Sequence, residues 1–204
     1  MSKFYIWGQI YEWSIEPLLK KTKLRVARYI FQYNLFPALD ICCGTGKQCH
    51  FIELDKQNVI GLDIDLKMIN YASSKYPHIS FLCADAANIP IRNKSFKGIV
   101  ISYALHDKPQ ELRKKMLDEA KRLLIPEGKI VLVDYEQPWN RRSRMGEFFV
   151  YLIERMGGCE HFRNWRQFLK KGGLRAFEEK NGLVEIERHD IELGNSSIVV
   201  AKFA

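Results

Sequence analysis

The sequence predicts a doubly wound α/β fold, with a mostly parallel seven-stranded sheet that ends in an antiparallel C-terminal hairpin. Five continuous apolar runs rich in β-branched residues lie between residues 38 and 135, and such runs are typical of parallel strands covered on both faces. Helical patterns separate these runs at short spacing. The last two runs alternate more, and the short segment ELGNSS between them can join only antiparallel neighbours.

The expected elements follow in order along the chain. The five parallel strands are ALDIC (38–42), NVIGLDI (58–64), ISFLCA (79–84), FKGIVISYA (96–104) and KIVLVDY (129–135). Helices are expected over residues 46–56 and 66–76. The clearest helix begins at Pro109, a favoured first helical position, and the segment IPEG ends it. The hairpin consists of LVEIERHDIEL (183–193) and SSIVVAKF (196–203).

The composition is that of one folded domain. With 204 residues, of which 47% are hydrophobic and 27% charged, the chain is expected to bury a single core. No apolar run approaches the roughly 18 residues that cross a bilayer, and the N-terminal stretch lacks the apolar centre of a secretory signal, so we expect a cytoplasmic protein. The five cysteines are scattered, which predicts reduced thiols and does not match the spacing of a zinc site.

Ligand chemistry is expected at the carboxyl ends of the parallel strands, where open α/β sheets bind their ligands. The first strand ends in ALDICCGTG, where Asp40 precedes two glycines that let the backbone approach a ligand closely. The second ends at Asp63, a carboxylate that can accept both hydroxyls of a ribose, and the third at Asp85 and Ala86. Cys49 stands where a dinucleotide fingerprint has its third glycine, which disfavours a nicotinamide-dependent oxidoreductase.

Four stretches in this order resemble the class I S-adenosylmethionine-dependent methyltransferases, and among them the type 11 group that includes the ubiquinone and menaquinone biosynthesis C-methyltransferases. They are ALDICCGTG, VIGLDIDLKMINYA, FLCADAANIPIRNKSFKGIVISYALH and EAKRLLIPEGKIVLVDYEQP. The resemblance implies a Rossmann-like domain that binds S-adenosylmethionine, releases S-adenosylhomocysteine and needs no metal. The expected parts are an N-terminal lid and helix (1–35), a cofactor-binding core (36–138), substrate-covering helices (139–182) and the edge hairpin (183–204).

The resemblance also implies cofactor contacts at the first two strand ends. Asp40, Gly44 and Gly46 would hold the methionine end of the cofactor, and Asp63 would take the ribose. The family usually has glycine where this chain has Cys42. The Cys42 side chain, which we count among the cofactor contacts, is therefore expected either to tuck into the sheet or to narrow the pocket.

The remaining implied contacts surround the adenine and the methionine ammonium group. Ile64 and Met68 would lie beside the adenine ring. Asp85 would accept from its exocyclic amine, and the amide of Ala86 would contact the ring. The carbonyl of Ser102 would accept from the methionine ammonium.

Catalytic and substrate candidates follow the fourth and fifth strands. His106 lies where the resemblance places the residues nearest the transferred methyl, and an unperturbed imidazole, which titrates near pH 6.5, suits a general base. The alternative is a histidine that only orders its loop. Tyr103, Asp134 and Tyr135 are candidate substrate contacts, with capping of the following loop as the alternative for the last two. Asp107 is expected to cap the next helix.

Basic segments flank the nearly neutral middle of the chain, whose net charge is +8. Residues 1–37 hold six Lys and Arg against two Glu, and residues 139–175 hold nine against three. The first segment also contains the candidate lid residues Tyr5, Tyr11 and Trp13, of which Tyr11 is a candidate substrate contact. An anionic partner, such as lipid headgroups, a phosphorylated substrate or nucleic acid, is indicated for seven residues of the second segment, with an ordinary solvated face as the alternative. These residues are Arg141, Arg142, Arg144, Arg163, Arg166, Lys170 and Lys171.

Together these features predict a methyltransferase that acts on a small-molecule or lipid-like, quinone-like acceptor, bound under residues 1–35 and 139–175. If the anionic partner is a lipid surface, the cytoplasmic protein would bind a membrane peripherally. Methylation of RNA is an alternative that only the basic flanks support. A protein that keeps the cofactor fold without catalysis is another.

Overall fold

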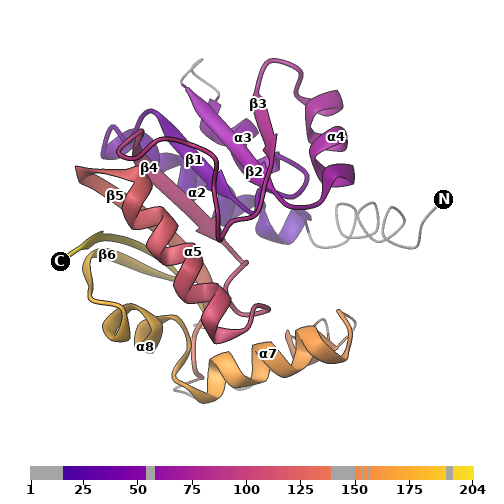
Figure 1. Ribbon diagram of the computed structural model, residues 1–204. Coiled ribbons are helices and arrows are strands. Elements are labelled where there is room, and N and C mark those ends of the chain that lie inside the picture. Colours follow the sequence, from indigo (N-terminus) through magenta and orange to yellow (C-terminus); the bar gives the residue numbers. More distant parts are fainter. Residues whose placement is uncertain (1–15, 54–57, 139–149, 153, 156, 192–194) are drawn as a thin grey trace.

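The computed structural model describes residues 16–53, 58–138, 150–152, 154–155, 157–191 and 195–204. Its centre is a seven-stranded sheet with the strand order β3-β2-β1-β4-β5-β7-β6 (Figure 1). The strands are β1 (Ala38–Ile41), β2 (Val59–Asp63), β3 (Ser80–Cys83), β4 (Phe96–Ser102), β5 (Leu124–Tyr135), β6 (Leu183–Ile191) and β7 (Ser196–Phe203). The helices are α2 (Glu16–Gln32), α3 (Lys47–Ile52), α4 (Leu66–Lys75), α5 (Gln110–Leu123), α7 (Cys159–Lys170) and α8 (Gly173–Lys180).

The predicted fold class is confirmed. Strands β1 to β5 are parallel, whereas β7 runs antiparallel to both β5 and β6. The strand order reverses between β1 and β4, so the carboxyl ends of these two neighbours form the switch point of the sheet. Among the described residues, no helix has both the length and the apolar character needed to span a membrane.

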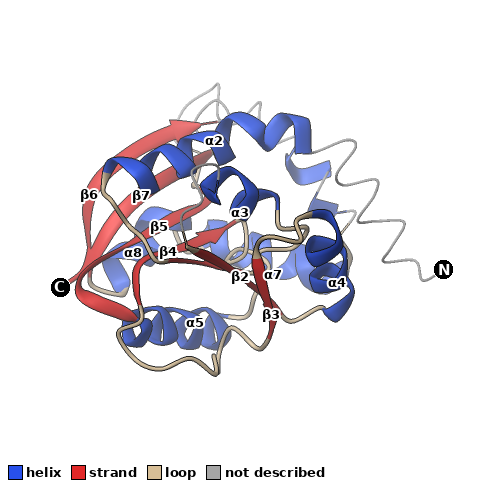
Figure 2. Cartoon of the chain, turned by 90° about the horizontal axis from the view of Figure 1, so that it is seen from above, coloured by secondary structure: helices blue, strands red, loops and turns tan. Residues whose placement is uncertain are grey.

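Helices cover both faces of the sheet, which explains the continuous apolar runs. On β4, Ile99 and Ile101 belong to a core shared with α5 and α8, while Val100 belongs to a second core shared with α2, α3 and α4. Figure 2 shows α2 and α5 on opposite sides of the strands. Because successive side chains of a strand point to opposite faces, every position of a doubly covered strand is apolar. In the same way, Cys42 packs against the first core and Cys43 belongs to the second.

Several boundaries differ from the expected ones. The first crossover helix, α3, ends at Ile52 instead of extending to residue 56. Helix α5 begins at Gln110, one residue after the expected start, and Pro109 occupies its N-cap position. Strand β5 begins at Leu124 rather than at Lys129, because the chain turns directly from the helix into extended structure and pairs Leu124 with Phe96 before a bulge. The segment IPEG therefore ends the helix as expected but lies within a strand.

Candidate functional site

The loop after β1 meets the end of β2. The amide of Gly44 donates to Asp63 Oδ2 at 2.8 Å, and the amide of Asp65 donates to Asp63 Oδ1 at 3.0 Å. A carboxylate offers about four acceptor positions, so Asp63 keeps capacity for further donors. Gly46 adopts φ of 75°, and a Cβ there would lie 2.7 Å from the Phe81 ring, whereas a Cβ at Gly44 would meet nothing within 4 Å. Gly46 thus serves the packing of the turn, while Gly44 borders open space.

Asp40 lies beneath this loop and is buried. Its Oδ2 accepts from Cys49 Sγ at 3.3 Å. Burial raises the pKa of Asp40 to about 7, and the contact with Cys49 opposes that rise only in part. Asp40 is therefore an acid that changes its charge near neutral pH, at the methionine end of the expected cofactor site.

This raised pKa predicts a pH-dependent stability. The folded state favours protonated Asp40. The contribution of this proton to the free energy of unfolding is therefore complete below the unfolded pKa of 3.8, and it disappears as the pH rises through about 7. Each unit of pKa shift corresponds to about 1.4 kcal/mol, so the loss amounts to a few kcal/mol. Urea unfolding of the wild type and of Asp40→Asn at pH 4, 5.5, 7 and 8 measures it. The free energy of unfolding of Asp40→Asn, relative to that of the wild type, should increase with pH. A difference between the two proteins that stays constant with pH would contradict the prediction.

Cys42, at the family's glycine position, has φ of 62°, a left-handed conformation that side chains rarely adopt. Its half-buried side chain packs against the core on the α5 side of the sheet. The first of the two expected arrangements is therefore the one found. Burial raises the pKa of the thiol to about 12, so it stays protonated. Tyr103, at the end of the neighbouring β4, also has a positive φ, of 51°.

The strain at Cys42 can be measured by substitution. Cys42→Val should lower the free energy of unfolding by about 2 kcal/mol, because a β-branched residue is disfavoured most at positive φ. Cys42→Gly should stay within about 1 kcal/mol of the wild type, since relief of strain offsets the lost burial. Cys83→Val, at an exposed cysteine on β3, is the control and should change stability by less than about 0.5 kcal/mol. Equal effects of valine at both positions would show that the backbone at Cys42 is not strained.

The expected adenine contacts lie along the second and third strand ends. Ile64 is 69% exposed, and Met68 is partly exposed on α4. Asp85 is exposed and accepts the amide of Ala87 at 2.9 Å, and Ala86 is buried next to it. Ser102 is partly exposed at the end of β4. The structure thus brings the expected cofactor residues to one edge of the sheet, with Ile64 open to solvent.

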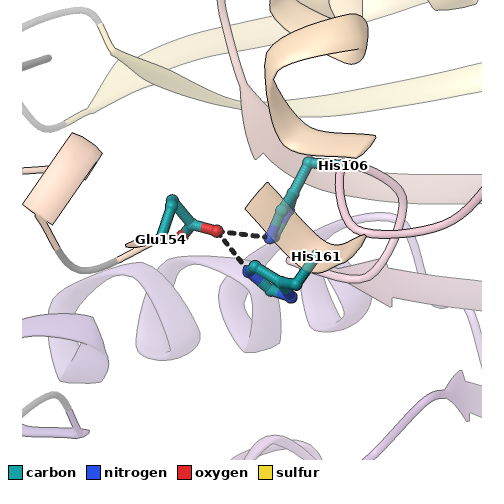
Figure 3. Close-up of side chains that lie close together, drawn as sticks. All are labelled: His106, Glu154 and His161. Atoms are coloured by element: carbon teal, nitrogen blue, oxygen red, sulfur yellow. Dashed lines mark hydrogen bonds and ion pairs between the residues drawn. The ribbon is translucent and has the colours of Figure 1, made fainter. Parts of the chain in front are cut away.

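His106 is the centre of a buried ionic network beyond β4. Its Nδ1 lies 2.8 Å from Asp134 Oδ1, and its Nε2 lies 3.4 Å from Glu154 Oε2. His161 Nε2 contacts the same Glu154 oxygen, and Tyr135 donates its hydroxyl to Glu154 Oε1 at 2.8 Å. Figure 3 shows one oxygen of the Glu154 carboxylate joined by dashed lines to a ring nitrogen of each histidine. His106 is only 4% exposed.

The carboxylates around both histidines favour the charged imidazolium. Burial alone would lower the pKa of His106, but Asp134 and Glu154 overcome it and raise the pKa to about 10. The pKa of His161 is raised to about 9, chiefly by Asp107 and Glu154. The pKa of Asp107 is well below its ordinary value, since His161 and Lys108 outweigh the effect of burial. In this arrangement His106 carries its proton at neutral pH. The expected role of His106 as a general base assumed an unperturbed pKa, and the structure does not give it one.

Two expectations for neighbouring acids need correction. Asp134 is fully buried, and Asp134 Oδ2 accepts the amides of Leu105 and His106 at 2.9 and 3.2 Å. Its Oδ1 accepts the Tyr135 amide at 2.8 Å in addition to the contact with His106, so it organises the loop after β4 instead of facing a substrate. Asp107 does not cap α5, because within the described part of the chain no side chain caps that helix. Its carboxylate pairs with Lys108 at 2.6 Å and faces His161 Nδ1 at 3.7 Å.

Helices α5 and α7 brace the same loop. Arg113 donates its Nε to the Leu105 carbonyl at 2.6 Å, and one terminal nitrogen to the carbonyls of His106 and Asn164, both at 3.1 Å. The side chain of Asn164 donates to the Asp107 carbonyl at 2.9 Å. The position of His106 is thus held from both helices.

Glu154 and His161 are the site residues that the sequence did not reveal. They lie 48 and 55 residues after His106, in the region expected only to cover the substrate. The one local signal is Glu154 itself, an acid within the mostly apolar stretch VYLIERM. Such an acid is buried only when it is paired.

An aromatic cluster adjoins this network, and Tyr103 and Tyr135 belong to it. The Tyr135 ring lies 4.8 Å from the His106 ring and 6.4 Å from Trp165. Beside the cluster is a surface cavity of about 860 Å³. Its lining residues are Gln137, Pro138, Tyr151, Phe162, Arg163, Trp165, Arg166, Gln167, Leu169 and Lys170. Three of the expected basic residues therefore gather at one cavity, and Lys171 is exposed nearby.

Some of the predicted site residues lie outside the described part of the chain. They are Tyr5, Tyr11, Trp13, Arg141, Arg142 and Arg144. The predicted lid and the first basic triplet therefore stay predictions.

The sheet order, the antiparallel β7 and the acids at successive strand ends are those of the class I S-adenosylmethionine-dependent methyltransferase fold. Residues 38–128, just under half of the chain, match the family described as a methyltransferase domain.

Several curated relatives carry quinone-related names. The chain is 37% identical over 126 residues to the 2-phytyl-1,4-naphtoquinone methyltransferase of Thermosynechococcus vestitus, a match that covers 57% of this chain and 53% of that protein. It is 35% identical over 120 residues to the demethylmenaquinone methyltransferase of Lactobacillus johnsonii, covering 53% of this chain and 48% of that protein. The chain thus spans about half the length of these relatives.

The fold itself has solved counterparts. An N-methyltransferase from Bradyrhizobium japonicum, solved in complex with S-adenosyl-L-homocysteine, superposes with a TM-score of 0.59 at 15% identity. The superposition covers 90% of this chain and 86% of that one. At this identity, the likeness shows the fold alone.

Proposed function

We propose that this protein transfers a methyl group from S-adenosylmethionine to a quinone-like small-molecule acceptor. The observation that carries the proposal is the arrangement along one edge of the sheet. Asp40 and Asp63 lie near the carboxyl ends of β1 and β2, and Asp85 follows the neighbouring β3. An aromatic cluster lies at the ends of the next two strands. Acids suit a cationic nucleoside, and aromatic rings suit a flat apolar acceptor.

The cofactor half of the proposal rests on unused binding capacity. Asp63 has acceptor positions left for the ribose hydroxyls, and the exposed Ile64 would be covered by the adenine. Gly44 borders open space on the side from which a ligand would approach. S-adenosylmethionine is a sulfonium, so the carboxylates at this edge favour it over a phosphate-bearing cofactor. The bound product in the N-methyltransferase of the same fold supports this choice.

The acceptor half rests on the cavity beside α7. Its walls combine Tyr151, Phe162 and Trp165 with basic side chains. The buried indole N–H of Trp165 has no hydrogen-bond partner among the described residues, so it is a donor that a quinone oxygen could use. The names of the curated relatives favour the same class of acceptor.

The reaction would depend on alignment. The acceptor would attack the methyl carbon in line, the carbon–sulfur bond would break, and the acceptor would then lose a proton to water. Fixing both reactants at one sheet edge can lower the barrier by several kcal/mol without a protein base. Because His106 is held as a charged donor, its role in this proposal is to position the loop after β4.

The proposal predicts that a labelled methyl group passes from S-adenosylmethionine to a quinol. The protein is incubated with S-adenosylmethionine labelled in its methyl group, together with a reduced naphthoquinol that lacks the ring methyl, and the organic extract is analysed by mass spectrometry. The label should appear in the quinol. Label in added RNA instead would favour the RNA alternative, and no transfer to either acceptor despite cofactor binding would favour a non-catalytic protein.

A further inference from the structure

We propose that His106, Glu154 and His161 form a binding site for one divalent transition-metal ion of the zinc type. Each residue offers one ligand atom, and the three atoms lie within 4.8 Å of one another. Two imidazoles and one carboxylate are a donor set that proteins use for zinc and ferrous iron. The inference does not depend on the methyltransferase activity.

One of the distances between ligand atoms already matches that of a metal site. Ligand bonds of about 2.0–2.1 Å in a tetrahedral site place neighbouring donor atoms roughly 3.3 Å apart. His106 Nε2 and Glu154 Oε2 are separated by 3.4 Å. His161 Nε2 lies closer to the same oxygen, so its ring would move outward by about 1 Å to admit an ion.

His161 has the freedom to make that movement. Its side chain is 28% exposed in the first turn of α7, whereas that of His106 is only 5% exposed. A Cβ at residue 157 would lie 2.6 Å from His161 Cδ2, so glycine at this position leaves room for the ring. An ion would therefore enter from the His161 side, and the open position of a three-ligand site would also face that side.

Each of the three ligand side chains also has a polar neighbour on the side that would face away from the ion. Asp134 holds His106 Nδ1, and Asp107 faces His161 Nδ1, so both Nε2 atoms are directed at Glu154. Tyr135 binds Glu154 Oε1 and leaves Oε2 toward the histidines. Carboxylates behind metal-binding imidazoles are the usual means of fixing ring orientation and tautomer. On binding, each ring keeps its Nδ1 proton and releases the proton on Nε2 to solvent.

An ion here would join three parts of the chain that are distant in sequence. His106 follows β4, Glu154 lies in the described segment before α7, and His161 is on α7 itself. Figure 3 shows the three side chains converging from these different segments. The expectation of no metal came from the cysteine spacing and from the family resemblance, and neither took account of this set of residues.

Zinc binding tests the inference directly. Chelator-treated protein is titrated with Zn²⁺ by calorimetry, in a Cys83→Ser, Cys159→Ser background because exposed thiols can bind zinc on their own. We expect one bound equivalent and a higher Tm with zinc. His161→Ala should lose both effects, and Asp107→Asn should weaken binding about 10–100-fold as an outer-contact change.

The control is His78→Ala. His78 Nε2 pairs with Glu53 Oε2 at 2.9 Å, and the described residues offer this histidine–glutamate pair no third ligand, so its removal should not change zinc binding. Co²⁺ provides a second measurement, since a four-coordinate nitrogen and oxygen site gives a visible absorption band that His161→Ala should abolish. If His161→Ala does not fold, Glu154→Gln replaces it in both assays. No uptake by the parent, or equal uptake by the ligand variant, would overturn the inference.

Discussion

Replacing Asp134 by alanine is expected to lower the free energy of unfolding by about 3–5 kcal/mol, the cost of leaving a buried charge without its partner. Asp134 accepts from the His106 ring and from the amides of Leu105, His106 and Tyr135, and it is fully buried. Its removal therefore takes away one of the two carboxylates beside the buried His106 ring, whose other partner is Glu154, and one acceptor from each of three backbone amides. Urea unfolding followed by circular dichroism measures the loss.

The matched control is Asp118→Ala, which removes an exposed acid paired with Lys114 one helical turn away. That change should cost less than about 0.5 kcal/mol. The double variant Asp134→Ala, His106→Ala should lose less free energy of unfolding than the two single variants lose in sum. It also removes the His106 cation, which in Asp134→Ala has lost its carboxylate at Nδ1. A loss below about 1 kcal/mol for Asp134→Ala would show that the network does not stabilise the fold.

Cofactor binding should disappear in Asp63→Ala. Two charge-assisted hydrogen bonds to a ribose contribute roughly 1.5–3 kcal/mol each, so their loss should weaken binding by at least about 100-fold. Asp63 also accepts the Gly44 amide, so the loop over the methionine end loses support at the same time. Titration calorimetry with S-adenosylmethionine and S-adenosylhomocysteine measures the change.

Three comparisons make this binding result specific. Asp118→Ala should bind like the wild type, because its exposed ion pair lies away from the expected pocket. His106→Ala should retain cofactor binding, since its partners are the acids of the network and not the residues of the cofactor edge. NAD should give no heat with any variant. Normal binding by Asp63→Ala would place the cofactor elsewhere in the fold.

The strand pattern was predictable because helices cover the central strands on both faces. Continuous apolar runs can be read without knowing their partners, and in a parallel sheet their carboxyl ends meet at one edge. This is why Asp40, Asp63 and Asp85 could be placed together from sequence alone. The start of β5 at Leu124 was missed, because the same apolar residue fits the last turn of a helix and the first position of a strand.

The environment of a side chain was not predictable in the same way. A histidine at a strand end suggests a base when its pKa is taken as unperturbed, and only the packing of α7 and the segment before it brings Glu154 and His161 to His106. Asp134 appeared to face the cleft because it ends a strand, but the loop after β4 folds over it and uses both of its oxygens.

The sequence by itself determined the sheet, the two apolar faces and the row of strand-end acids, since these follow from residue periodicity and from the direction of parallel strands. Only the tertiary structure decided the left-handed backbone of Cys42, the pKa of His106 and the meeting of two histidines with Glu154. These properties depend on Coulomb interactions and steric contacts across a few ångströms. For His106 these contacts come from Asp134, Glu154 and His161, which lie 28, 48 and 55 positions later in the chain, and no local pattern records that proximity.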